Sequence, residues 1–199
     1  MLTFKTNELR AALCHSAVKD IRHYLNSVCL QVIGAVPTCY LVSTDGFTLF
    51  AGIANVTWTN EPQKGNWSML IPESTIKAAL KTAGTKAKTI LLQSLPDGRY
   101  SLGNIVFTPI DGQFPNWERV IPTSHNAELA QFNPFLLIKC NDSLNYWLDT
   151  KGKVYPLQYN GDSTASYQVT GAVCAVMPMR DVYNPDPLIP MPSSFQQSA

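Results

Sequence analysis

The adjacent residues Cys14 and His15 are the first place in the sequence where a nucleophile and a base could work together. Both fall in a segment whose apolar spacing predicts a helix, and neighbouring positions on a helix point to different faces. A thiol nucleophile needs its base within hydrogen-bonding distance, so this pair has poor geometry for covalent catalysis. His23 and His125 lie in separate segments, without a carboxylate placed to orient either ring. The sequence therefore predicts that the protein is not an enzyme.

The common sequence motifs that hold cofactors or metal ions are absent from the sequence. It contains no Gly-rich phosphate loop, no HExxH helix and no paired-carboxylate motif. The five cysteines have no CxxC spacing and are odd in number: Cys14, Cys29, Cys39, Cys140 and Cys174. Free, mostly buried thiols in a reduced compartment are the simple interpretation. Neither a metal site nor a cofactor is predicted.

The net charge and the hydropathy of the chain argue against some kinds of binding partner. The formal net charge is +1, so no global positive field draws the chain to nucleic acid or membrane. There is no signal peptide, and no apolar run reaches the roughly 18 residues that a membrane span needs. We therefore expect a cytoplasmic protein with no membrane partner. Hydrophobic residues make up 45% and charged residues 15%, which leaves room for apolar surface buried against another protein.

Three segments share one pattern: an extended apolar stretch, a polar or proline break, and a short amphipathic helix. They recur at a nearly constant interval, at residues 2–13, 69–80 and 129–140. Each helix has start signals, which are Asn7, then Pro72 with Glu73 and Ser74, then Asn133-Pro134. The sequence therefore predicts one unit that is used three times.

Short strands separated by turn residues are predicted after each helix. They cover 26–33, 39–43 and 48–57, then 89–94, 99–102 and 105–109, then 146–148, 154–159, 166–169 and 172–178. Each unit is thus βαβββ, and the fold class is α+β. One helix on such a sheet leaves half its apolar face uncovered, so the units should pair. We expect a two-unit domain at 1–122, an unpaired half-domain at 123–180, and a Pro-rich tail at 181–199 that is extended or disordered.

Four stretches resemble the bacterial DNA sliding clamp, the DNA polymerase III beta subunit, in the family's order. They are DIRHYLN at 20–26, LVSTDGFTLF at 41–50, PIDGQFPNWERVIP at 109–122 and VMPMR at 176–180. The resemblance covers 1 to about 122 as a complete middle domain and 127–180 as the second half of the C-terminal domain. It implies a DNA-clamp fold built from the three units. The family's N-terminal domain and the other half of its last domain have no counterpart, so a closed ring is not implied.

The resemblance also implies a peptide-binding pocket, because clamps dock a short, mostly hydrophobic peptide of a polymerase or repair factor between these two domains. The matching positions are Arg22, Tyr24, Leu25, Thr44, Gly46, Phe47, Leu49, Pro115, Arg119, Val120, Ala175, Met177, Pro178, Met179 and Arg180. Methionine gives an adaptable apolar lining, and arginine can meet a peptide carbonyl or carboxylate. Phe47 replaces the family's usual histidine and Thr48 a basic residue, which leaves the peptide preference open.

Structural explanations compete with this interpretation. Asp45-Gly46 is a hairpin signal in any β protein. Met177 and Met179 alternate along a predicted strand, so one of them could belong to the core. The aromatic stretch 114–117 could simply close the edge of the domain.

Clamps line their channel with helices that meet phosphates without reading bases. The equivalent candidates here are Arg10, Lys19, Lys77, Lys81 and Lys139. The positive patch is mild, and a solvated helix face explains it equally well. We expect at most weak, salt-sensitive, sequence-independent contact with duplex DNA.

Together these features predict a processivity factor that tethers a polymerase or another protein with a clamp-binding peptide to DNA. The alternative is a truncated mimic that binds such peptides without encircling DNA and modulates host replication. Either fits a bacterial or phage-encoded replication protein. If the third unit pairs with its copy in a second chain around a two-fold axis, a homodimer forms, and two dimers would supply a tetrameric ring.

Overall fold

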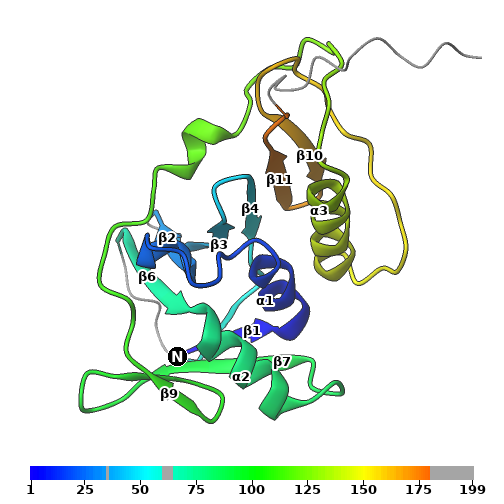
Figure 1. Cartoon of the computed structure of the whole chain (residues 1–199). Helices are drawn as coiled ribbons and strands as arrows, with labels where there is room; N and C mark the ends of the chain where they lie inside the picture. Colours follow the sequence, from blue (N-terminus) through cyan, green and yellow to red (C-terminus); the bar gives the residue numbers. More distant parts are fainter. Residues whose placement is uncertain (35, 60–64, 180–199) are drawn as a thin grey trace, which may run out of the picture.

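Two antiparallel sheets and three α-helices make up the part of the chain that the structure, a computed structural model, describes: residues 1–34, 36–59 and 65–179 (Figure 1). The first sheet has the order β5 (Thr57–Trp58), β1 (Leu2–Lys5), β7 (Thr89–Ser94), β8 (Tyr100–Leu102) and β9 (Ile105–Phe107). The second has the order β10 (Ala165–Val169), β11 (Ala172–Val176), β4 (Thr48–Ile53), β3 (Thr38–Thr44), β2 (Ser27–Ile33) and β6 (Trp67–Pro72). The predicted α+β class and clamp fold are confirmed.

The helices are α1 (Thr6–Leu13), α2 (Glu73–Ala83) and α3 (Pro134–Trp147), and α1 lies between the other two (Figure 1). Leu9 of α1 and Ile76 of α2 are fully buried, as the helical spacing of apolar residues predicts. These helices and the inner faces of both sheets share one hydrophobic core. No helix within the described ranges has the length and apolar character to span a membrane.

The predicted start of α3 is confirmed, but that of α1 is wrong. Asn133 accepts a hydrogen bond from the Phe135 backbone N–H (3.0 Å), and Pro134 opens the helix. Asn7 instead lies inside the first turn of α1, and its side chain donates to Asp149 Oδ1 (2.8 Å). A contact with the loop after α3 therefore replaces the predicted cap.

Three predicted strands are also wrong. Residues 146–148 end α3 instead of forming a strand, and the stretch 48–57 is divided between β4 and β5. At 154–159 only Gln158 forms an isolated bridge, to Ser166. The backbone N–H of Tyr155 donates to the side chain of Asn141 on α3 (2.9 Å). This N–H is therefore not available for a hydrogen bond to a neighbouring strand. The predicted tail at 181–199 lies outside the described residues.

Pairing of β11 with β4 joins the third unit to the first. The register runs over five pairs, from Ala172 opposite Gly52 to Val176 opposite Thr48. A Cβ atom on Gly52 would lie 2.6 Å from the Trp147 ring, so the glycine allows the end of α3 to approach the sheet. The two units therefore meet across a continuous sheet and a close helix–sheet contact, and this junction positions the site.

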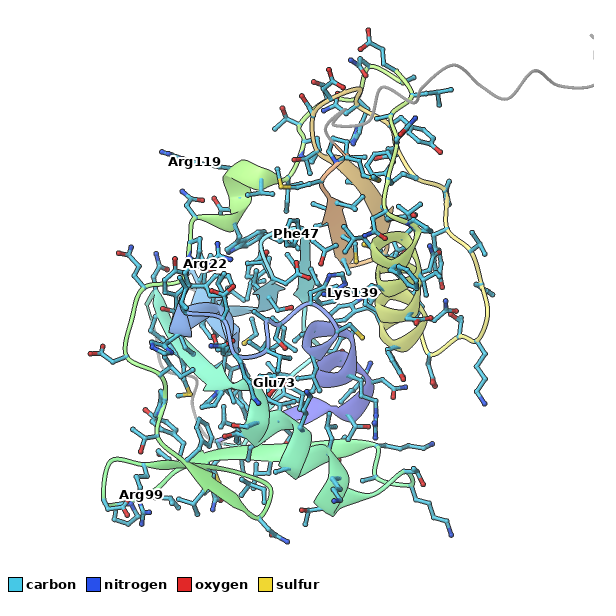
Figure 2. The ribbon with its side chains drawn as sticks, viewed as in Figure 1. Arg22, Phe47, Glu73, Arg99, Arg119 and Lys139 are labelled. Carbon is cyan, nitrogen blue, oxygen red and sulfur yellow. The ribbon has the colours of Figure 1, made fainter. Side chains whose placement is uncertain are left out.

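An ion pair fastens α3 to the turn between β3 and β4. Lys139, on α3 (Figure 2), has its Nζ 2.5 Å from Asp45 Oδ2, and both side chains are largely covered. Asp45 Oδ1 also accepts hydrogen bonds from the backbone N–H groups of Phe47 (2.9 Å) and Thr48 (2.8 Å). Burial raises the pKa of Asp45, but the hydrogen bond from Lys139, the backbone hydrogen bonds from Thr48 and Phe47 and the charge of Lys139 together outweigh it and hold the pKa below its ordinary value.

We predict that Asp45→Asn lowers the free energy of unfolding by about 1 to 3 kcal/mol at neutral pH, because Lys139 loses its charged partner while the turn keeps an oxygen acceptor. Since the pKa of Asp45 is lower in the folded than in the unfolded protein, the pair stabilises the fold above about pH 4, and this contribution is lost as the pH falls through the folded pKa. Urea unfolding at several pH values measures both effects.

The matched control is Asp97→Asn, which removes the exposed pair between Asp97 and Arg99 in the turn between β7 and β8. Screening by solvent makes that pair weak, so its loss should change stability little. Equal destabilisation by the two substitutions at neutral pH would contradict the role assigned to Asp45.

Candidate peptide-binding groove

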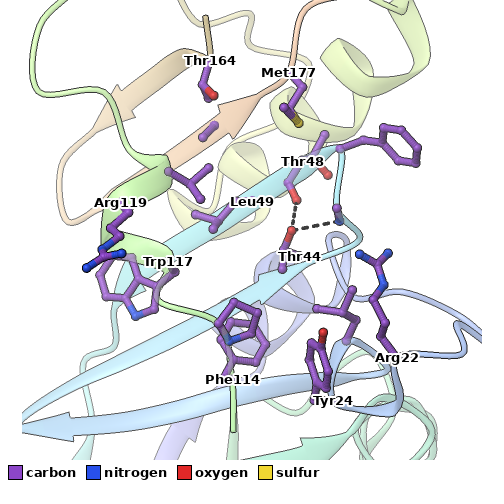
Figure 3. A pocket seen from close by; sticks show the side chains of 16 residues that line it. Arg22, Tyr24, Thr44, Thr48, Leu49, Phe114, Trp117, Arg119, Thr164 and Met177 are labelled. Atoms are coloured by element: carbon purple, nitrogen blue, oxygen red, sulfur yellow. Dashed lines mark hydrogen bonds between the residues drawn. The ribbon is translucent and has the colours of Figure 1, made fainter.

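An apolar cavity of about 380 Å³ lies beside the junction of β4 and β11 (Figure 3). Its lining comes from five segments of the chain: the turn at η1 (His23–Leu25), the β3–β4 hairpin, the segment around η2 (Trp117–Val120), the residue before β10, and the end of β11. We call this cavity the groove. It is lined by Arg22, Tyr24, Leu25, Thr44, Gly46, Phe47, Thr48, Leu49, Phe114, Pro115, Trp117, Arg119, Val120, Thr164, Ala175 and Met177.

Arg22 borders the groove on the η1 side. Its guanidinium donates to both carboxylate oxygens of Asp20 (3.0 and 2.9 Å), and these hydrogen bonds lower the pKa of Asp20 to about 2. The Arg22 head also lies against Gly46, where a Cβ atom would be 3.2 Å from Nη2. Gly46 has a φ of +93°, which a residue with a side chain rarely adopts. Sequence and geometry therefore agree that glycine is required in this turn.

The β3–β4 hairpin supplies the floor of the groove and one exposed aromatic ring. Thr44 Oγ1 donates to the Thr48 carbonyl (2.7 Å) and accepts from the Gly46 backbone N–H (3.1 Å), which ties the turn together. Leu49 is buried beneath the groove, whereas the Phe47 side chain is 63% exposed. An exposed phenyl ring beside a buried apolar floor is suited to contact with an apolar ligand.

The opposite wall is an irregular segment held by the indole of Trp117. Trp117 Nε1 donates to Gln31 Oε1 (2.7 Å), and its ring lies 5.7 Å from that of Tyr40. The following turn carries Arg119, on the other side of the groove from Arg22 (Figure 3). Among the described residues Arg119 forms no ion pair, unlike Arg22. The guanidinium of Arg119 is therefore more available than that of Arg22 to pair with a ligand at the rim of the groove.

The last wall is the end of β11. Ala175 is buried, and Met177 is 42% exposed and donates its backbone N–H to the Phe47 carbonyl (3.0 Å). The Met179 backbone N–H donates to the Gln131 carbonyl (2.8 Å), and neither Pro178 nor Met179 lines the groove. The chain therefore leaves the groove after Met177. Arg180 lies outside the described residues.

The structure thus brings all the other sequence-proposed pocket residues around one cavity, and adds four to them. Phe114 and Trp117 fall within the stretch 109–122 that carried the resemblance, so their aromatic character was the available signal. Thr48 lies between two proposed residues. Thr164 lies just before β10 and had no signal in the sequence.

The basic residues proposed for DNA contact are not equally available. Lys139 is paired with Asp45, and Lys77 with Glu73. Within the described ranges Arg10, Lys19 and Lys81 form no ion pair. Lys19 belongs to a loop, because α1 ends at Leu13. These residues do not form one continuous helical face.

Among the comparisons with known proteins, only that with solved structures finds similar molecules. No protein-family model and no curated protein matches the chain. Among solved structures, the DNA polymerase III beta subunit of Pseudomonas aeruginosa superposes with a TM-score of 0.66 at 17% identity, over 90% of this chain and 66% of that one. The Caulobacter crescentus beta sliding clamp gives 0.68 at 17% (90% and 65%), and the Thermotoga maritima beta subunit 0.65 at 17% (90% and 66%). This chain therefore has the fold of the bacterial sliding clamps and spans about two thirds of their length.

Proposed function

We propose that this protein is a non-enzymatic, clamp-like processivity factor that tethers a polymerase or another replication factor to DNA. The observation that carries the proposal is the groove, an apolar cavity at the junction of two units with an arginine on either side. The similarity to sliding clamps supports it through the fold. Such a factor acts in the cytoplasm, where replication proteins and DNA meet.

The lining of the groove suits a short, mostly apolar peptide. Leu49 and Ala175 form a buried floor, and Met177, with its flexible thioether, can adapt to different side chains. The volume lies in the range of small-ligand pockets and accommodates a few side chains rather than a folded domain. Arg119 can pair with a carboxylate or backbone carbonyl of the peptide at the rim.

We predict that Val120→Asp weakens binding of a fluorescent peptide carrying a polymerase's clamp-binding motif by about tenfold or more, because it places an unpaired carboxylate against the apolar peptide. Fluorescence anisotropy measures the affinity. Val120 is 40% exposed, so the protein should still fold.

The matched control is Val106→Asp, a valine that is 47% exposed on β9 in the other sheet. It should leave the affinity unchanged. The assignment of the groove fails if the wild-type protein does not bind the peptide, or if both substitutions weaken binding equally.

We also propose weak contact with duplex DNA through Arg10, Lys19 and Lys81. Such contact releases counterions, so affinity falls as salt rises. We predict that the double variant Arg10→Gln with Lys81→Gln has a less steep plot of the logarithm of DNA affinity against the logarithm of salt concentration. The slope should fall in magnitude by about 1 to 2, since each lost phosphate contact removes roughly one unit. Anisotropy with labelled duplex at several salt concentrations measures this, with Arg99→Gln, in the exposed turn between β7 and β8 (Figure 2), as the control.

The same titration separates the tether from the alternative of a truncated mimic. If the wild-type protein binds the peptide but shows no salt-dependent binding to duplex DNA, the mimic is the better description. Binding to both ligands supports the tether.

We further propose that a second copy of this chain covers the outer face of the third unit. Several large apolar side chains there are exposed, including Phe135 (78%) and Ile138 (56%) on α3. Leu129 and Val154, on the segments flanking α3, are 80% and 85% exposed. A two-fold contact between equal apolar faces is the commonest way to bury such a surface.

We predict that the wild-type protein is dimeric or tetrameric at tens of micromolar, and that Ile138→Asp shifts it towards monomer, because a charge then enters the apolar contact. Light scattering coupled to size exclusion measures the mass. Val18→Asp, at a valine that is 63% exposed, is the control and should not change it. A strictly monomeric wild-type protein would refute this assembly.

A further inference from the structure

Behind the groove, three fully buried side chains with metal-binding atoms meet. They are His15, in the turn after α1, Cys140 on α3 and Cys174 on β11. One ligand atom of each lies within 4.8 Å of the others. The cluster therefore joins the first unit to the third at the junction that forms the groove.

Ser143, one turn after Cys140 on α3, adds a fourth donor. Its Oγ lies 2.9 Å from His15 Nε2 and 3.2 Å from Cys174 Sγ, and that Sγ lies 3.8 Å from Nε2. In a tetrahedral zinc site, bonds of about 2.0 to 2.3 Å separate the donors by roughly 3.3 to 3.8 Å. The separations of Ser143 Oγ from His15 Nε2 and from Cys174 Sγ are therefore within about half an ångström of those around a zinc ion, and Cys140 Sγ lies within 4.8 Å of the other two ligand atoms.

The surroundings of His15 direct one ring nitrogen to this space. Thr48 Oγ1 donates to the Asp45 carboxylate (3.1 Å), so it accepts the hydrogen bond from His15 Nδ1 (2.9 Å). In the tautomer that donates from Nδ1 to Thr48, Nε2 presents its lone pair towards Ser143 and Cys174, and Ser143 Oγ, which donates to the Cys140 carbonyl (2.8 Å), keeps a lone pair for the same space. A hydrogen bond that fixes the tautomer of a ligating histidine from behind is a common feature of zinc sites.

Burial and charge fit a divalent cation of soft character. Two thiolates balance a charge of 2+, so the occupied site has no net charge in the low-dielectric interior. Thiolate sulfur and imidazole nitrogen are donors that favour zinc over magnesium or calcium.

We propose that His15, Cys140 and Cys174, with the Ser143 hydroxyl as fourth donor, bind one zinc ion. Binding forms two zinc–sulfur bonds and releases the two thiol protons to solvent, with no change in oxidation state. The ion holds α3 and β11 against the turn after α1 and so fixes one wall of the groove. The site does not depend on the groove's function. The sequence gives no indication of it, because its ligands come from three distant segments rather than from a compact motif.

The test is titration of the reduced, full-length protein with Co²⁺ and with Zn²⁺, the latter in competition with a chromophoric chelator. We expect one ion per chain, a Co²⁺ spectrum with thiolate charge-transfer and tetrahedral bands, and a rise in Tm with Zn²⁺ that excess chelator reverses. Cys174→Ser should weaken Zn²⁺ binding by about tenfold or more. Cys29→Ser, at a buried cysteine of the other hydrophobic cluster, should leave it unchanged.

The proposal is overturned if the wild-type Co²⁺ spectrum lacks the thiolate bands, if Zn²⁺ does not bind at one per chain, or if Cys174→Ser binds as tightly as the wild type. If Cys174→Ser does not fold, the wild-type Co²⁺ spectrum and the Zn²⁺ stoichiometry decide alone.

Discussion

Pairing between β11 and β4 is the interaction on which the rest of this structure depends. It extends the sheet of the first unit by the two strands of the third, and it brings Met177 to Phe47 at one end and Trp147 over Gly52 at the other. Without this register the end of β11 would not lie beside the β3–β4 hairpin, and the groove would lose the wall that Ala175 and Met177 form. Ladder hydrogen bonds fix the position of every side chain along the strand, so a slip of one residue would turn Ala175 away from the groove.

Polar groups cross the same junction in an unbroken series. Lys139 contacts Asp45, Asp45 accepts from Thr48, Thr48 bonds to His15, and His15 bonds to Ser143 beside Cys174. Each group in this buried series has a partner within the protein, and separation of the two units would leave several of them without one. Apolar burial alone would tolerate small shifts between the units, whereas this series is satisfied in only one arrangement. It is therefore suited to hold the walls of the groove at a fixed distance.

The sequence predicted those parts of the fold that depend on local patterns. Leu9 and Ile76 recur at helical spacing, and Asn133-Pro134 is a local start signal, so the positions of the three helices and the start of α3 were predicted, but not the start of α1. The strand at 154–159 failed because its backbone bonds to side chains of α3, which no local pattern reveals. Asn7 failed as a cap because Asp149 takes its side chain, 142 positions further along the chain. Most residues of the groove were predicted through the resemblance to clamps. Thr164 and the cluster around His15 were not predicted, because contacts between distant segments bring them into place.

The central claim, that the groove binds a peptide, is tested most directly by hydrogen–deuterium exchange with and without a clamp-binding peptide. Backbone amides slow their exchange where a ligand covers or rigidifies them. We predict slower exchange at Gly46–Leu49, at η2 and at Val173–Met177, with no change in β7–β9 of the other sheet. Protection confined to other segments, or no protection at a peptide concentration that saturates binding, would contradict the account.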